Sequence, residues 1–328
     1  MSFQIFPSTY KNISCIVMES DSLVVKIIPE SGGKIQSIFD KRLNKEYLVQ
    51  SPHAEYIRST YGSDYGAGDV SGFDEVFPSI EQCFYPLPPW QGTRVPDHGE
   101  VWALPWDLQT KDQSMTLSVN GVRFPYRLQK KVEFIRDNAI RLSYVAENLS
   151  HFDFYFAWAA HNLFVTEPGT RIVLPPSVNK VFSTCSRKNQ LGKFGGIHDW
   201  PVTTYNGEPY DISDANPKYS DLCEKYYAMG QVAEGWCALH HPQSGATIGL
   251  SYPIDQVPYL GVWEGIMNNQ YVTALEPCTG DLDFLDTAIQ WGRCSVIKAK
   301  SKYEWYLNLV FDNVKKISSI DKNGIIIE

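Results

Sequence analysis

Alternating hydrophobic and polar positions recur along the chain and predict β-strands. Between residues 303 and 311, the odd-numbered positions are Tyr, Trp, Leu, Leu and Phe, and the even-numbered positions are Glu, Tyr, Asn and Val. This period of two is typical of a strand with one buried face. Shorter β-rich runs occupy 23–28, which stops at Pro29, and 246–252.

Two longer runs, 127–135 and 139–148, flank the turn-forming tripeptide Arg136-Asp137-Asn138 and predict a hairpin. The segment 152–158 is almost entirely aromatic, as in a strand buried on both faces. No apolar stripe with helical spacing extends beyond about two turns, and 23 Gly and 20 Pro interrupt the chain. The pattern therefore predicts an all-β sandwich or barrel.

No low-complexity linker or internal repeat divides the 328 residues, so we expect one domain over 1–328. The segment 188–225 is polar, contains Gly and Pro, and is weakly patterned. We interpret it as a long loop or insertion, a feature that often carries function in a compact domain.

Composition narrows the function classes. The formal net charge is −8 and no basic run occurs, which argues against nucleic acid and anionic membranes as partners. The seven Cys are scattered without a CxxC pair, so the sequence signals neither a zinc site nor a redox dithiol. The amino terminus lacks the pattern of a signal peptide, and no stretch could span a membrane as a helix, so we expect a cytoplasmic protein.

Four short stretches concentrate functional side chains. The first, 71–78, holds Asp74 and Glu75. Neighbouring residues of a strand point to opposite faces, so only one of the two could face a given cleft. A carboxylate can accept hydrogen bonds from two sugar hydroxyls at once, but a solvated loop explains the stretch equally well.

The second stretch, 97–102, places an imidazole, a carboxylate and an indole at alternating positions, in His98, Glu100 and Trp102. If the stretch is extended, all three lie on one face, and the indole could stack on a pyranose ring. A lone His is usually structural, but His with an acid and an aromatic ring at this spacing favours a site.

The third and fourth stretches each end an apolar strand. His161 closes the run 156–161, where it must face a cavity or find a hydrogen-bond partner in the core. Its ordinary pKa suits acid–base chemistry near neutrality. Glu276 lies between apolar residues and a Pro, where burial would make it a better base, and Trp263 and Glu264 add a ring and an acid upstream.

Together and in this order, these stretches resemble the aldose 1-epimerase (galactose mutarotase) superfamily. The resemblance covers roughly residues 27–311 and is carried by 28–38, which looks like the opening strand and glycine turn, by His98-Gly99, by His161 before Asn162-Leu163-Phe164, and by Leu275-Glu276-Pro277.

The resemblance implies a galactose mutarotase-like two-layer β-sandwich, the supersandwich, with an active-site cleft on the concave sheet. It implies a small-molecule sugar as partner and no cofactor, and the sequence itself shows no metal-type cluster of ligands. In the implied mechanism Glu276 removes the proton of the C1 hydroxyl as general base. His161 gives a proton to the ring oxygen, and His98 assists that oxygen as the ring opens.

Three positions depart from the family pattern. The asparagine–arginine pair that binds sugar hydroxyls is not recognisable, and Arg58 is the nearest candidate. Asp74 and Asp255 both remain possible as the aspartate that orients the substrate. Ala160 precedes His161 where the galactose enzymes have Asn. The sugar therefore stays open, as does the choice between a monomer and a homodimer.

Two other functions compete with the epimerase. One is a non-catalytic sugar-binding or sensing protein, which would not need His161 and Glu276 together. The other is a carbohydrate lyase or hydrolase. A glycosidase requires two carboxylates across the scissile bond, and Glu100 with Glu276 or Glu264 could supply them.

Overall fold

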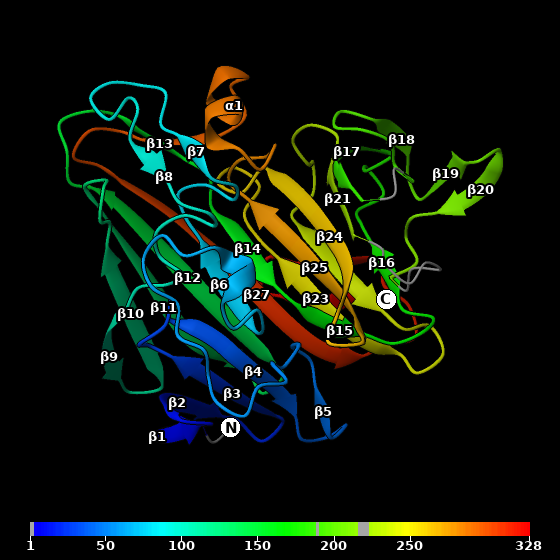
Figure 1. Cartoon of the computed structure of the whole chain (residues 1–328). Helices are drawn as coiled ribbons and strands as arrows, with labels where there is room; N and C mark the ends of the chain where they lie inside the picture. The colour runs from blue at the N-terminus through cyan, green and yellow to red at the C-terminus, as the bar shows by residue number, and fades with distance from the viewer. Residues whose placement is uncertain (1–2, 188–189, 216–222) are drawn as a thin grey trace.

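The computed structural model describes residues 3–187, 190–215 and 223–328, and its core is formed by two antiparallel sheets packed face to face (Figure 1). The larger sheet runs in the order β1 (Gln4–Tyr10), β2 (Ile13–Glu19), β3 (Leu23–Ile28), β4 (Lys34–Asp40), β6 (Phe73–Val76), β14 (Ala159–Asn162), β25 (Gln270–Cys278), β24 (Tyr259–Met267), β21 (Cys223–Ala228), β17 (Lys180–Ser186) and β18 (Ile197–Asp199). Off this path, β5 (Lys45–Glu46) pairs with β4, and β15 (Phe164–Thr166) pairs with β25.

The smaller sheet runs in the order β16 (Arg171–Val173), β22 (Trp236–His240), β23 (Ala246–Ser251), β27 (Lys302–Asn313), β12 (Ala139–Asn148), β11 (Tyr126–Arg136), β10 (Ser114–Asn120) and β9 (Asp107–Lys111). Four two-stranded ribbons accompany the described sheets: β7 (Cys83–Phe84) with β8 (Arg94–Val95), β13 (Phe154–Phe156) with β26 (Ser295–Ile297), β19 (Val202–Tyr205) with β20 (Glu208–Asp211), and β28 (Ser319–Ile320) with β29 (Ile326–Ile327).

Among the residues just given, helix is confined to short pieces. The α-helix α1 (Leu285–Gln290) sits at the end of the sandwich opposite β1 and β2, and a 3₁₀ turn, η1, covers Tyr65–Ala67 (Figure 1). In the described part of the chain, no helix has the length and apolar character needed to cross a membrane.

The prediction of an all-β sandwich is confirmed. The run 23–28 coincides with β3, and the predicted hairpin is β11 and β12, joined at residues 137–138. The alternating run 303–311 lies in the middle of β27, which pairs with β12 on one side and β23 on the other.

Two predictions differ from the structure. Only Phe154–Phe156 of the aromatic segment 152–158 forms a strand, and it pairs with β26 outside both large sheets. The segment 188–225, expected to be loop-rich, contains β18, the β19–β20 hairpin and the start of β21; its residues 188–189 and 216–222 lie outside the described residues. Strands of three or four residues leave little periodicity in a sequence, which explains why the pattern missed them.

The core lies between the two sheets and is rich in aromatic rings. Tyr144 stacks on Trp305 with ring centroids 5.1 Å apart. Trp158, which directly precedes β14 of the larger sheet, packs against the same indole with ring centroids 5.3 Å apart. Such pairs add about 0.5–1.5 kcal/mol each beyond their apolar burial. This packing fixes the height of β14, the strand that follows Trp158, above the smaller sheet.

A buried ion pair also joins the sheets. Lys130 on β11 donates to Glu75 Oε1 on β6 over 2.9 Å and to the carbonyl of Gly33 over 2.8 Å, and neither side chain is exposed. Tyr144 donates to the same carboxylate oxygen and Trp158 Nε1 to the other, each over 2.9 Å. The carboxylate is thereby fully hydrogen-bonded, as a buried charge requires.

Replacing Lys130 with Met should therefore lower the free energy of unfolding by about 3–5 kcal/mol, because Glu75 would remain buried without its cation. Urea unfolding measures the change. The control is Lys131→Met, the next residue on the exposed face, whose partly exposed ion pair with Glu133 should contribute less than about 1 kcal/mol. Equal losses in the two variants would contradict this account of the core.

Candidate active site

Three titratable side chains lie in a row on the outer face of the larger sheet. His161 on β14 is directly opposite Asp74 on β6. On its other side β14 pairs with β25 through Ala159 and Cys278, a register that brings His161 beside Glu276. Strand alternation sends Asp74 outward and Glu75 into the core, so Asp74 is the carboxylate of that pair that lies on the same face as His161.

Asn162 fixes the position of His161 relative to Glu276. Its side-chain amide donates to the carbonyl of Leu275 over 2.6 Å and accepts from the Leu275 amide over 3.0 Å. The side chain thus replaces two backbone bonds where the β14–β25 ladder ends. The histidine and the glutamate precede and follow these anchored residues and are held on neighbouring strands.

A tight loop brings His98 to the same place. His98 has a left-handed φ of 57°, and its amide donates to the carbonyl of Ile80 over 2.7 Å. At Gly99, any Cβ would lie 2.0 Å from the carbonyl oxygen of Phe77, so only glycine fits. Asp97 Oδ1 lies 2.8 Å from Nδ1 of His98 and orients the ring.

Tyr65 connects the two histidines. Its ring stacks on His98 with centroids 4.0 Å apart, and its hydroxyl lies 3.3 Å from Nδ1 of His161. The same hydroxyl donates to Asp74 Oδ2 over 2.9 Å. The imidazoles of His98 and His161 meet edge to face, 4.9 Å between centroids. These contacts make one cluster of two imidazoles, a phenol and a carboxylate.

A lysine accompanies each carboxylate of the row. Lys34 Nζ lies 3.1 Å from Asp74 Oδ2, and Lys225 Nζ contacts Glu276 Oε2. The second oxygen of each acid, Oδ1 of Asp74 and Oε1 of Glu276, is buried and has no hydrogen-bond partner. A buried oxygen without a protein partner costs free energy, and either atom could accept a hydrogen bond from a ligand hydroxyl.

Burial shifts the protonation equilibria of the cluster. Desolvation raises the pKa of Glu276 above its ordinary 4.5, and the charge of Lys225 opposes that rise. The pKa of Asp74 is raised for the same reason, against the charge of Lys34. Desolvation and the charges of His98, Lys225 and Lys34 lower the pKa of His161 well below 6.5. His161 is therefore neutral at pH 7.

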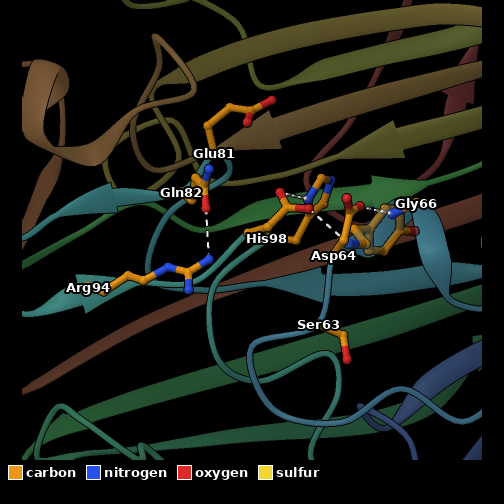
Figure 2. A pocket seen from close by; sticks show the side chains of 9 residues that line it. Ser63, Asp64, Gly66, Glu81, Gln82, Arg94 and His98 are labelled. Atoms are coloured by element: carbon orange, nitrogen blue, oxygen red, sulfur yellow. Dashed lines mark hydrogen bonds and ion pairs between the residues drawn. The ribbon is translucent and has the colours of Figure 1, made fainter.

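A pocket of about 390 Å³ lies among the loops beside this cluster and reaches it at Tyr65 and His98, whereas Asp74, His161 and Glu276 do not line it (Figure 2). Tyr65 and His98 form part of its wall, and the other lining residues are Ser63, Asp64, Gly66, Glu81, Gln82, Arg94 and Asp97. His161 lies behind Tyr65 and His98, in contact with both. A polar pocket of this size suits a small polyhydroxylated molecule better than an apolar one.

Several residues predicted to bind substrate lie elsewhere. Glu75 belongs to the core, as described above. Glu100 is buried and accepts from the Tyr61 hydroxyl and from the amide of Arg123, so it holds a loop. Glu264 faces the interior beneath β24, where Tyr226 donates to it over 2.9 Å and burial raises its pKa to about 8. These three carboxylates do not join the cluster.

The remaining predicted residues flank the site or lie apart from it. Trp102 packs edge-on against Tyr65 and donates to the carbonyl of Asp97 over 2.9 Å, so it supports the site from behind. Trp263 shares the outer face with Glu276, and its ring covers Gly265. Arg58 is exposed and pairs with Glu30, 2.5 Å away, and Asp255 is exposed in a turn between β23 and β24.

Four side chains of the cluster were not among the predicted residues: Tyr65, Asp97, Lys34 and Lys225. Asp97 was the detectable one, because it precedes His98 directly. Lys225 lies in the segment interpreted as loop, and its strand, Cys-Glu-Lys-Tyr-Tyr-Ala at 223–228, shows no clear alternation that could have revealed it. Among the residues that the structure describes, no group of three or more His, Cys, Asp or Glu side chains could hold a metal ion.

Solved structures with the same architecture come from several bacteria. Slr1438 from Synechocystis sp. PCC 6803 matches with a TM-score of 0.69 at 16% identity, over 94% of this chain and 100% of its own. A proposed aldose 1-epimerase from Klebsiella pneumoniae matches with 0.67 at 12% identity, over 94% and 82%. A galactose mutarotase-like protein from Clostridium acetobutylicum matches with 0.65 at 14% identity, over 95% and 99%.

These likenesses show that the chain has the galactose mutarotase-like fold, as its sequence motifs predicted. No family model matches the sequence, and no curated protein is a detectable relative. At identities of 12–16% the neighbours define the fold alone.

The lowered pKa of His161 is open to direct measurement. The ring protons of His161, assigned by their loss in His161→Gln, should keep the chemical shifts of the neutral imidazole as the pH falls to about 6 in an NMR titration, because burial disfavours the cation. A midpoint at or above the ordinary 6.5 would contradict the described environment.

Proposed function

We propose that this protein is an aldose 1-epimerase, an isomerase that interconverts the α and β anomers of a hexose or hexose derivative. One observation carries the proposal. A buried carboxylate with an unpartnered oxygen, Glu276, lies beside two imidazoles that touch each other, on the outer face of a galactose mutarotase-like sheet.

Opening a pyranose ring requires one proton to leave the C1 hydroxyl and another to reach the ring oxygen. Glu276 Oε1 accepts the first proton, and the carbonyl of the open-chain aldehyde forms as the bond from C1 to the ring oxygen breaks. His161 delivers the second proton. Rotation about the C1–C2 bond and the reverse transfers close the ring on either face. Each acid–base contribution is worth about 10²–10⁴-fold.

The environments of the two groups suit these roles. The raised pKa of Glu276 makes its carboxylate a stronger base than one in water. The lowered pKa of His161 makes its imidazolium a stronger acid, which a weakly basic ring oxygen requires. Tyr65 and Asp74 orient the His161 ring, and Asp74 Oδ1 remains available for a sugar hydroxyl.

The hydrolase alternative loses support from the structure. Both of its candidate carboxylate pairs contain Glu100, combined with Glu276 or Glu264; Glu100 is buried and bonded to a loop, and Glu264 faces the interior. A non-catalytic sugar-binding protein would use the same pocket. It would not need a base with a free oxygen beside an imidazole, so the anomer-exchange assay below separates the two functions.

Saturation transfer at the anomeric protons, across a panel of free and phosphorylated aldoses, should show exchange accelerated by the wild type. Glu276→Gln should reduce this rate by about 10²–10⁴-fold, because the amide cannot accept the C1 proton. The matched control is Glu264→Gln, a buried carboxylate on the inner face that should leave the rate unchanged. Binding without accelerated exchange for every sugar would instead establish a binding protein.

The pH dependence of kcat/KM follows from the raised pKa of Glu276 and the lowered pKa of His161. Glu276 must be ionised, so activity is lost as the pH falls through its raised pKa. His161 must be protonated, so activity is also lost as the pH rises through its lowered pKa. The profile, corrected for buffer catalysis, should therefore peak on the acid side of neutrality. A plateau extending to about pH 8 would exclude His161 as the proton donor.

A further inference from the structure

Lys225 reaches Glu276 across an intervening strand. It projects from β21, and Glu276 from β25, with β24 between them. Gly261 of β24 lies directly opposite Glu276, and a Cβ at Gly261 would come within 2.9 Å of the ring of Tyr227. The absence of a side chain at this position leaves room for the Tyr227 ring, beside which Lys225 contacts Glu276 Oε2.

A second carboxylate anchors the same ammonium group. Asp283 Oδ1 lies 4.0 Å from Lys225 Nζ, and the Tyr227 hydroxyl donates to that oxygen over 2.5 Å. Lys225 Nζ also lies 5.3 Å from the centroid of the Tyr227 ring. The lysine side chain is 7% exposed, so these partners replace nearly all of its water.

The backbone that presents Asp283 is strained. Leu282 and Asp283 both have left-handed φ angles, 75° and 62°, a conformation that costs a buried leucine of the order of 1–3 kcal/mol. The carbonyl of Asp283 accepts from the amide of Glu81 over 2.9 Å, which fixes the turn against the loop that leads to His98. Strain of this kind persists where the surrounding contacts determine the geometry, and it is common in functional sites.

We propose that Lys225 is a positioning residue for Glu276: it holds Oε2 and, as a fixed positive charge, keeps the carboxylate ionised with Oε1 free for the substrate proton. The proposal rests on the function assigned to Glu276 above. Lys225 itself transfers no proton, because Glu276 and Asp283 stabilise its charged form.

The charge balance around Glu276 requires this cation. Its described neighbours are Lys225 and Tyr227 from β21, His161 from β14, His98 from the loop before β9, Asp283 from the turn after β25, and Cys278 from its own strand. The pKa of His161 is lowered well below 6.5, and Asp283 repels a second negative charge. Desolvation raises the pKa of Glu276 and the charge of Lys225 opposes that rise, so removal of Lys225 would raise the pKa further.

Three variants of Lys225 separate the effect of its positive charge from the effect of its hydrogen bond to Glu276. Lys225→Met removes both the charge and the bond, Lys225→Gln keeps a donor without the charge, and Lys225→Arg keeps the charge. The acid limb of kcat/KM should move upward by roughly 1–3 pH units in the Met and Gln variants, with KM little changed, and should return toward the wild-type position in the Arg variant. Lys180→Met, which removes an exposed lysine of the adjacent β17, should leave the profile unchanged.

An infrared titration tests the proposal without any sugar. In protein labelled with ¹³C at glutamate carboxyls, the Glu276 band is assigned by its loss in Glu276→Gln. The midpoint of this band should rise in Lys225→Met and Lys225→Gln and be restored in Lys225→Arg. Circular dichroism checks that each variant is folded, and one folded variant without the charge is enough for the test. An unchanged midpoint would overturn the role of Lys225. Absence of anomer exchange in the wild type, with the midpoint shifted, would overturn the proposed function alone.

Discussion

The buried ion pair between Glu75 and Lys130 is the interaction on which the rest of the structure depends. It joins β6 of one sheet to β11 of the other, and it also bonds the carbonyl of Gly33 at the start of β4. Two core rings, Tyr144 and Trp158, complete its hydrogen bonds. Because side chains alternate along a strand, the anchoring of Glu75 on the inner face fixes Asp74 on the outer face, where the site is built.

The carboxylates of the site differ from the Glu75–Lys130 pair in how far their hydrogen bonds are satisfied. Both carboxylate oxygens of Glu75 accept hydrogen bonds, whereas Asp74 and Glu276 each keep one buried oxygen without a partner. Lysines neutralise both acids, so their charge is tolerated while their hydrogen-bonding capacity is not satisfied. A molecule that carries hydroxyl groups would satisfy these oxygens, and the free energy it gains would come from a penalty that the folded protein already bears.

Much of the fold followed from the sequence. The period of two at 303–311 and the turn at 136–138 correspond to β27 and the β11–β12 hairpin, because long strands that bury one face carry a strong alternating pattern. The short strands of 197–211 carried too few residues for such a pattern. The aromatic run 152–158 was misleading because apolar composition does not reveal the pairing partner of a strand.

The site was only partly predictable. His98, His161 and Glu276 lie where chain order and flanking glycine or proline suggested. Glu100, Glu264 and Arg58 satisfied the same local criteria but bond to loops, core or solvent. Lys225 contacts Glu276, which is 51 positions away in the sequence, and Tyr65 contacts His161, which is 96 positions away. No local sequence pattern contains such contacts.

The most direct test of the central claim is a crystal structure of the protein soaked with a hexose. We expect a pyranose in contact with His98, with its C1 hydroxyl within hydrogen-bonding distance of Glu276 Oε1, its ring oxygen facing His161, and another hydroxyl on Asp74 Oδ1. A sugar bound with C1 directed to solvent, or bound away from Glu276, would contradict it.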